Sequence, residues 1–317
     1  MNRIQRVLYL FVAVGTTALS GANCPRPPWN PAPPPAPRVL SAAPTLEEVI
    51  QVVNRNSGQI QSFTTSKASV SAPGLPSLRA NLAFQRPRRL RLRADLLASS
   101  EIDLGSNDEV FWFWAKRNQT PGVMYCRHDQ YAGSQTRQVL PVEPDWLIEA
   151  LGVVELDPAL PHEGPRQLPG DRLEIRTIRN TAQGPMTKVT VVHGSQGWVL
   201  EQHMLDAQGR LVASAVASGH QADPLTGVVM PRTVNIKCPA AQFSARIDLG
   251  DVQINRLATN QTELWQMPTY QGSPPVNICE MPPAAPAMPA AGVSARPVAS
   301  TPGPRSQPPD AAQRPYW

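Results

Sequence analysis

Residues 89–94 read Arg89-Leu90-Arg91-Leu92-Arg93-Ala94, with arginine at every second position and an apolar residue at the others. Successive side chains of a β-strand point to opposite faces, so this period of two predicts a strand with one buried face. The arginine face is predicted to be wet and cationic. Three neighbours would suit it: solvent, anionic lipid headgroups, or an acidic patch on a partner protein.

A second strand is expected at 109–116, which reads Glu109-Val110-Phe111-Trp112-Phe113-Trp114-Ala115-Lys116. Its four consecutive aromatic residues put two large rings on each face. One pair can build the core, whereas the other pair needs a cover formed by a lid, a partner or a ligand. Residues 123–126 are expected to form a neighbouring strand.

More strands are expected along the chain, at 78–85, 172–178, 187–193, 198–205, 210–217, 228–237 and 242–254. Turn signals at 194–197 and 206–209 favour tight hairpins between the middle members of this series. Pro231 lies inside one of the predicted strands, so it should occupy an edge or a bulge, because proline cannot donate a ladder hydrogen bond.

Two helices are expected among these strands. The first, at 45–60, begins with Thr45 and Glu48 at capping-box spacing and carries an apolar stripe of Leu46, Val49, Ile50 and Val53. The second is short, at 144–152. It ends at Gly152 and carries Trp146, Leu147, Ile148 and Leu151. The following residues, 153–171, are expected to be a loop-rich insertion.

Proline marks both flanks of this β-rich body. Of the 36 prolines, eight lie in 25–37 and ten in 281–317. Residues 1–22 combine two early arginines, an apolar run and small residues, which is typical of a secretory signal peptide. We therefore expect a signal peptide at 1–22, a proline-rich tether at 23–43, a folded body at 44–280 and a disordered tail at 281–317.

Cys24 has two interpretations. The stretch Leu19-Ser20-Gly21-Ala22-Asn23-Cys24 resembles a bacterial lipobox, in which the cysteine is lipidated and becomes the mature N-terminus. The proline-rich stretch beginning at Pro25 favours this interpretation, since it would hold the body off the membrane. Asn23 departs from the pattern, which has Gly, Ala or Ser at that position. The alternative is ordinary cleavage after Ala22, which leaves no lipid anchor.

The other cysteines, Cys126, Cys238 and Cys279, are odd in number. Export permits disulfides without requiring them, and a Cys238–Cys279 bridge is conceivable, although spacing alone does not decide the pairing. Cys126 and His128 are expected on one face of a strand, but a metal site needs more ligands than two. We expect neither a metal nor a cofactor.

Composition and motifs argue against several classes of function. Charged residues make up 17% of the chain, against about 25% in typical soluble domains, which disfavours a coiled coil, a nucleic-acid-binding tail or an acidic scaffold. The five histidines are scattered. No serine lies in a G-x-S-x-G motif, and no glycine-rich phosphate loop follows a strand. The chain is therefore not expected to be an enzyme.

The order of these elements, behind a signal peptide, resembles the outer-membrane lipoprotein-sorting (LolA/LolB-like) family. The resemblance covers about 45–270 and rests on 45–50, 87–92, 107–112, 227–232 and 264–268. It implies a mainly β (α+β) fold, a curved antiparallel sheet or half-open β-barrel capped by two helices. The longer body and the insertion at 153–171 depart from the family pattern.

Membership of that family would imply an apolar cavity for acyl chains. A curved sheet with an apolar inner face must be capped, and a movable cap over an apolar cavity suits a lipid binder. The residues predicted to line the cavity are Leu46, Val49, Ile50, Val53, Phe111, Trp112, Phe113, Trp114, Trp146, Leu147 and Leu151.

Three hypotheses for the function follow. The first is a periplasmic carrier or receptor for lipid or lipoprotein acyl chains, attached to the outer membrane through Cys24. The second is a structural or interaction lipoprotein whose interior is filled by its own side chains. The third is an exported hydrolase, because export does not exclude enzymes.

Overall fold

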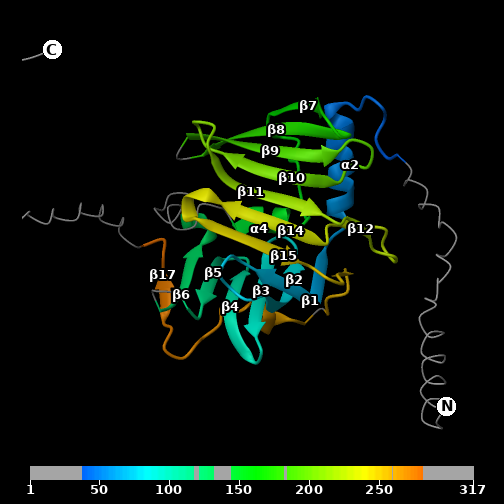
Figure 1. Cartoon of the computed structure of the whole chain (residues 1–317). Coiled ribbons are helices and arrows are strands. Elements are labelled where there is room, and N and C mark those ends of the chain that lie inside the picture. Colours follow the sequence, from blue (N-terminus) through cyan, green and yellow to red (C-terminus); the bar gives the residue numbers. More distant parts are fainter. Residues whose placement is uncertain (1–37, 118–120, 132–143, 182–183, 259, 281–317) are drawn as a thin grey trace, which may run out of the picture.

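The computed structural model of the chain describes residues 38–117, 121–131, 144–181, 184–258 and 260–280 (Figure 1). The predicted signal peptide, Cys24, most of the predicted tether and the predicted tail lie outside the described residues. Within the described part, no helix is long and apolar enough to cross a membrane.

One large sheet organises the described residues (Figure 1). In spatial order its strands are β17 (Pro275–Asn277), β6 (Val123–Arg127), β5 (Val110–Ala115), β4 (Ser99–Ser106), β3 (Arg89–Leu96), β2 (Leu78–Gln85), β1 (Ser62–Ser71), β15 (Phe243–Asp248), β14 (Thr233–Cys238), β11 (Leu211–Ser218), β10 (Val199–Leu205), β9 (Gly184–His193), β8 (Arg172–Thr181) and β7 (His162–Leu168). The short β16 (Gln253–Ile254) also pairs with β1.

The sheet is curved and open, because β17 and β7 lie at its two ends and do not pair with each other (Figure 1). Its neighbours are antiparallel, except that β17 runs parallel to β6. The predicted fold class, a mainly β protein with a curved antiparallel sheet and a few helices, is confirmed.

Four strands of this sheet, β1, β4, β7 and β17, were not expected from the sequence. Serine and threonine dominate β1, and β7 contains Pro165, so neither shows a clear apolar alternation. β7 can hold a proline because it is the edge strand of the sheet. The region 153–171, which was expected to be rich in loops, therefore contains an edge strand.

Pro231 interrupts the strand expected at 228–237. It separates β13 (Val229–Met230) from β14, and β13 pairs with β12 (Gln221–Ala222) in a small separate sheet. Its position between two strands agrees with the missing backbone donor of proline.

The described helices are α2 (Leu46–Gly58), α3 (His128–Tyr131) and α4 (Pro144–Ala150). The Glu48 backbone N–H donates to the Thr45 hydroxyl at 3.2 Å, which makes Thr45 the N-cap of α2. The Glu48 carboxylate does not close the predicted capping box. It accepts from the backbone and hydroxyl of Ser41 instead, at 2.7 and 2.9 Å.

Two apolar clusters hold the helices against the sheet. The main cluster joins α4 to β1, β2, β3, β11 and β14 through residues such as Trp146, Leu151, Phe63, Phe84 and Leu90. The second joins the α2 stripe to Leu40, Val154, Leu156 and β8. Full burial of each large apolar side chain stabilises the fold by about 1.5–3 kcal/mol.

Candidate binding cavity at helix α4

A cavity of about 300 Å³ lies between α4, the ends of β8, β9 and β10, and the turn before β3. Its described lining residues are Arg86, Pro87, Asp145, Trp146, Ile148, Glu149, Val153, Glu155, Asp157, Arg179, Met186, Lys188 and Met204. This volume is at the lower end of the range of small-molecule pockets, about 300–1,000 Å³. We call it the α4 cavity.

One part of the lining is apolar and deformable. Trp146 and Ile148 come from α4, Val153 from the segment after it, and Met186 and Met204 from β9 and β10. Methionine is unbranched and adapts its shape to what it contacts. Two methionines and a tryptophan in one lining therefore form a surface that can adapt to a flexible apolar chain.

The other part of the lining is charged. The Lys188 ammonium forms an ion pair with the Glu149 carboxylate, and the Lys188 side chain is only 3% exposed. The Gln202 amide donates to the Glu149 carbonyl at 3.0 Å, which ties α4 to β10. A buried lysine needs its partner, because an unpaired charge in this position would be strongly destabilising.

Three lining residues carry enclosed polar atoms that have no hydrogen-bond partner among the described residues: Asp145 Oδ1, Trp146 Nε1 and Arg179 Nε. Buried polar atoms are usually satisfied, so each such atom calls for an explanation. They provide two donors and one acceptor beside an apolar surface. That combination fits a molecule with an apolar part and a polar end.

The predicted cavity residues are distributed over four clusters of the described core. Leu46, Val49, Ile50 and Val53 pack under α2 against β8. Trp146, Leu147 and Leu151 belong to the main core under α4, Phe111 belongs to a third cluster, and Trp112 and Trp114 belong to a fourth. Phe113 is half-buried on the same face of β5 as Phe111. Of this set, Trp146 alone is among the described lining residues of the α4 cavity.

The sequence analysis missed Arg179, Met186, Lys188 and Met204, which come from three adjacent strands. One signal was present. Lys188 precedes a run of β-branched residues in β9, where a lysine on the inward face is unusual.

Both aromatic faces of β5 are covered by other parts of the chain. On one face, Phe111 meets Tyr131 edge-on at 5.4 Å. On the other, Trp114 stacks on Tyr270 at 3.8 Å, and its Nε1 donates to the Ser273 hydroxyl at 3.1 Å. The sequence required a cover, and residues 262–280, which we call the C-terminal strap, provide it on the tryptophan face.

The arginine face of β3 is wet only in part. Arg93 is half-exposed, whereas Arg91 is 7% exposed under the C-terminal strap. Arg91 donates to Asp103 at 2.6 Å and to the carbonyls of Leu264 and Gln266 at 3.1 and 2.7 Å. The prediction of a wet face is therefore wrong for Arg91, because a strap remote in sequence and the Asp103 carboxylate bury it.

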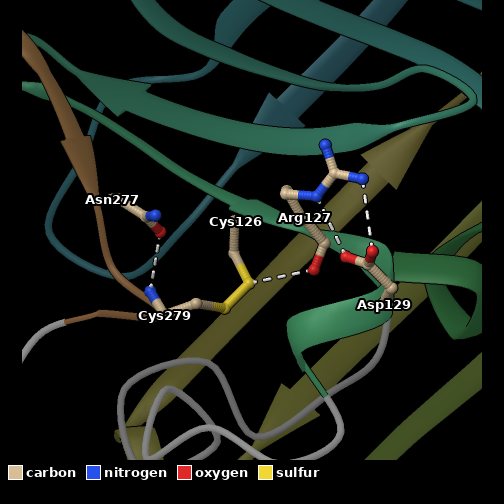
Figure 2. Close-up of a disulfide and its surroundings, with 5 residues drawn as sticks. All are labelled: Cys126, Arg127, Asp129, Asn277 and Cys279. Atoms are coloured by element: carbon tan, nitrogen blue, oxygen red, sulfur yellow. Dashed lines mark hydrogen bonds and ion pairs between the residues drawn. A yellow bond between two sulfur atoms is a disulfide. The ribbon is translucent and has the colours of Figure 1, made fainter.

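A disulfide joins Cys126 of β6 to Cys279 at the end of the strap, as Figure 2 shows. Next to it, the Cys279 backbone N–H donates to the Asn277 side chain at 3.1 Å, and Arg127 pairs with Asp129 at 3.1 Å (Figure 2). The conceivable Cys238–Cys279 bridge is thus corrected. Cys238 is a buried free thiol, and burial raises its pKa to about 11.

Asp171, His193 and Ser195 meet on the surface, yet they do not form a nucleophile–base pair. The Ser195 hydroxyl donates to the Asp171 carboxylate, and His193 Nδ1 lies 3.5 Å from that carboxylate. Among the described residues no hydrogen bond joins the Ser195 hydroxyl to His193, and activation of a serine needs that bond. No group of three or more metal-ligating side chains occurs in the described part either.

No protein-family model and no curated protein sequence matches the chain. Solved structures do. A DUF1329 family protein from Desulfovibrio piger matches with 11% identity and a TM-score of 0.46, covering 70% of this chain and 99% of that one. An outer-membrane lipoprotein-sorting protein domain from Vibrio parahaemolyticus matches with 11% identity and a TM-score of 0.47, covering 70% and 100%.

A LolA superfamily protein from Nitrosomonas europaea matches with 10% identity and a TM-score of 0.41, covering 69% of this chain and 97% of that one. The resemblance expected from the sequence thus recurs among solved structures. At this identity and with TM-scores below 0.5, the likeness concerns the arrangement of the chain and carries nothing about ligand or partner.

Proposed function

We propose that this chain is an exported cell-envelope protein, anchored to the outer membrane through lipidated Cys24, that binds acyl chains of a lipid or lipoprotein. The observation that supports the proposal is the mixed lining of the α4 cavity. Trp146, Met186 and Met204 offer a deformable apolar surface, and the unpartnered donors of Trp146 and Arg179 lie beside it. Binding of this kind needs no catalytic residue.

A second candidate is a structural or interaction lipoprotein without a ligand. It is favoured because ten of the eleven residues expected to line a cavity, all except Phe113, pack against the chain's own side chains in four apolar clusters. The two candidates differ in one property, namely whether the α4 cavity exchanges its contents with an acyl ligand.

Tryptophan fluorescence tests this difference directly. We expect dodecanoate to produce a saturable change in the emission of the purified protein, because its acyl chain would lie against the Trp146 indole and change the polarity around it. Trp146→Phe should remove the change. Trp114→Phe is the matched control, since Trp114 stacks on Tyr270 away from the α4 cavity and its loss should leave the change in place.

Lipid extraction and mass spectrometry of the protein purified from cells give the second readout. Acyl-chain lipids bound in stoichiometric amount support the carrier. If no acyl ligand is extracted and dodecanoate leaves the fluorescence of every variant unchanged, the interaction lipoprotein is correct.

A further inference from the structure

A second hollow lies on the opposite face of β3 from α4, independent of the proposed acyl site. It has a volume of about 410 Å³ and lies between β1, β2 and β3 on one side and residues 251–257 and 261–264 on the other. We call it the arginine cleft. The alternating arginines of β3 place their side chains on this face, and Arg91 and Arg93 line the hollow. Neither of them lines the α4 cavity.

The register of the sheet places the cleft's floor and walls. Ala83 of β2 pairs with Thr64 of β1 on one side and with Arg91 of β3 on the other. The small Ala83 side chain leaves room between Thr64 and Arg91. Asn81 pairs with Arg93 two residues along, about 6.6 Å further, so amide and guanidinium groups continue the same surface.

Contacts from Arg91 fix the roof of the cleft. Its two hydrogen bonds to the carbonyls of Leu264 and Gln266 hold the strap in place over β3. Its Nε is enclosed and has no hydrogen-bond partner among the described residues. The Arg91 guanidinium carbon also lies 5.2 Å from the centroid of the Trp112 ring, and this cation–π contact helps to fix the orientation of the guanidinium.

The described lining of the cleft is cationic. Lys67, Arg91 and Arg93 line it together with the carboxylate of Asp251, and the buried Asp103 carboxylate pairs with Arg91 behind the wall, so one positive charge remains in excess. The Lys67–Asp251 pair is at 2.6 Å, but both side chains are more than two-thirds exposed, and such pairs contribute little and open readily. Arg93 lies 3.8 Å from Asp103, beyond hydrogen-bond distance, and its Nη2 makes one long hydrogen bond to the Ser100 hydroxyl at 3.5 Å, so its other donors remain available.

Neutral polar side chains complete the lining. Thr64, Ser66, Asn81, Gln253 and Gln261 line the cleft, and no side-chain hydrogen bond occupies them within the described part of the chain. Hydroxyl and amide groups around two guanidinium groups can donate to several oxygens of one anion. A phosphate group has three acceptor oxygens and a charge between −1 and −2. It is therefore the anion that can accept hydrogen bonds from most of these donors.

We propose that the arginine cleft binds a phosphate group, carried either by a small soluble compound or by a lipid headgroup. Arg93 and Lys67 would contact the phosphate oxygens, whereas Arg91, whose charge Asp103 compensates, would hold the roof. The site is separate from the α4 cavity, so it can be tested whether or not the acyl proposal holds.

Isothermal titration with inorganic phosphate tests the site on the Cys24→Ser chain, in which no acyl anchor contributes. We expect saturable binding, weakened at least tenfold in Arg93→Gln and several-fold in Lys67→Gln. Arg210→Gln is the matched control, because Arg210 is also an exposed arginine paired with an aspartate but lies outside the cleft. Near-ultraviolet circular dichroism checks that each variant is folded.

Vesicle sedimentation separates the two sources of phosphate. If phosphatidylcholine vesicles containing phosphatidylglycerol pellet the Cys24→Ser chain but not its Arg93→Gln form, the cleft takes a lipid headgroup. If they pellet neither form while inorganic phosphate still binds, the ligand is soluble. Absence of saturable phosphate binding overturns the proposal, as does equal weakening by Arg93→Gln and Arg210→Gln, which would indicate a general charge effect.

Discussion

Asp103 of β4 connects β3, β5 and the C-terminal strap. Its carboxylate is fully buried and accepts from Arg91 at 2.6 Å, from the Tyr270 hydroxyl at 2.7 Å and from Trp112 Nε1 at 3.3 Å. Gly105, opposite Trp112, makes this possible. A Cβ on Gly105 would lie 2.2 Å from the indole, so only glycine lets the ring lie flat over β4.

Tyr270 gives this network a pH dependence. Burial and its hydrogen bond to Asp103 raise the pKa of the Tyr270 phenol to about 12. The unfolded chain loses this proton near pH 10. The stabilising contribution of the neutral phenol is therefore complete below about pH 10 and is lost as pH rises toward 12.

We expect the free energy of unfolding to fall more steeply between pH 9.5 and 11.5 in the wild type than in Tyr270→Phe, measured by urea denaturation. Tyr125→Phe, which removes another phenol of the same cluster, should keep the steep wild-type decline. Parallel curves for the wild type and Tyr270→Phe would show that the Asp103–Tyr270 bond does not form in solution.

At the scale of elements, the C-terminal strap is held in two ways. Non-covalent contacts include the parallel pairing of β17 with β6 and the bond from Asn107 to the Trp265 carbonyl at 3.1 Å. The covalent contact is the disulfide, which joins residues 153 positions apart in the sequence. A cross-link that closes so long a loop restricts the unfolded chain strongly.

We expect a reductant to lower the free energy of unfolding by about 2–5 kcal/mol, the usual range for a native disulfide. Acrylamide quenching of tryptophan should rise at the same time, since the strap covers Trp112 and Trp114. The Cys126→Ala/Cys279→Ala variant should be insensitive to the reductant, whereas Cys238→Ala, which removes the free thiol, should stay sensitive. Equal stability with and without the reductant would contradict the pairing.

The local sequence predicted those elements whose own pattern is strong. β3, β5 and α2 could be located because alternation or helical spacing reflects one buried face. β1 and β4 could not, since serine and threonine in β1 and serine and acidic residues in β4 interrupt any apolar alternation. The strap that buries Arg91 comes from about 170 residues further along the chain, and no local pattern reveals such a contact.

The same limit applied to the candidate site. Trp146 was predicted because it stands in an apolar helix, yet its neighbours in the α4 cavity come from β8, β9 and β10. The sequence predicted that one face of β5 builds the core and that the other needs a cover. It could not tell that the strap, rather than a ligand, covers the tryptophan face, because that depends on tertiary pairing and on the disulfide.

For the molecule as a whole, the point at which the N-terminal segment joins the folded body is fixed. The backbone N–H groups of Val39 and Leu40 both donate to the Ser195 carbonyl, at 2.8 and 3.1 Å, and Leu40 is 2% exposed. The proline-rich stretch 25–37 lies between this point and Cys24. If it is extended as its composition predicts, at about 3.1 Å per residue, it would separate the body from a lipid on Cys24 by about 40 Å.

Lipidation at Cys24 decides whether that separation matters. We expect the wild type to fractionate with membranes and Cys24→Ser to be released into the soluble fraction, because one substitution removes every acyl chain of the anchor. Cys238→Ser should stay with the membranes, since that thiol is buried in the body. Mass spectrometry of the mature N-terminus should find an acylated Cys24. A soluble wild type that begins at Asn23 would instead establish cleavage after Ala22, and the proline-rich stretch would then be a free extension rather than a tether.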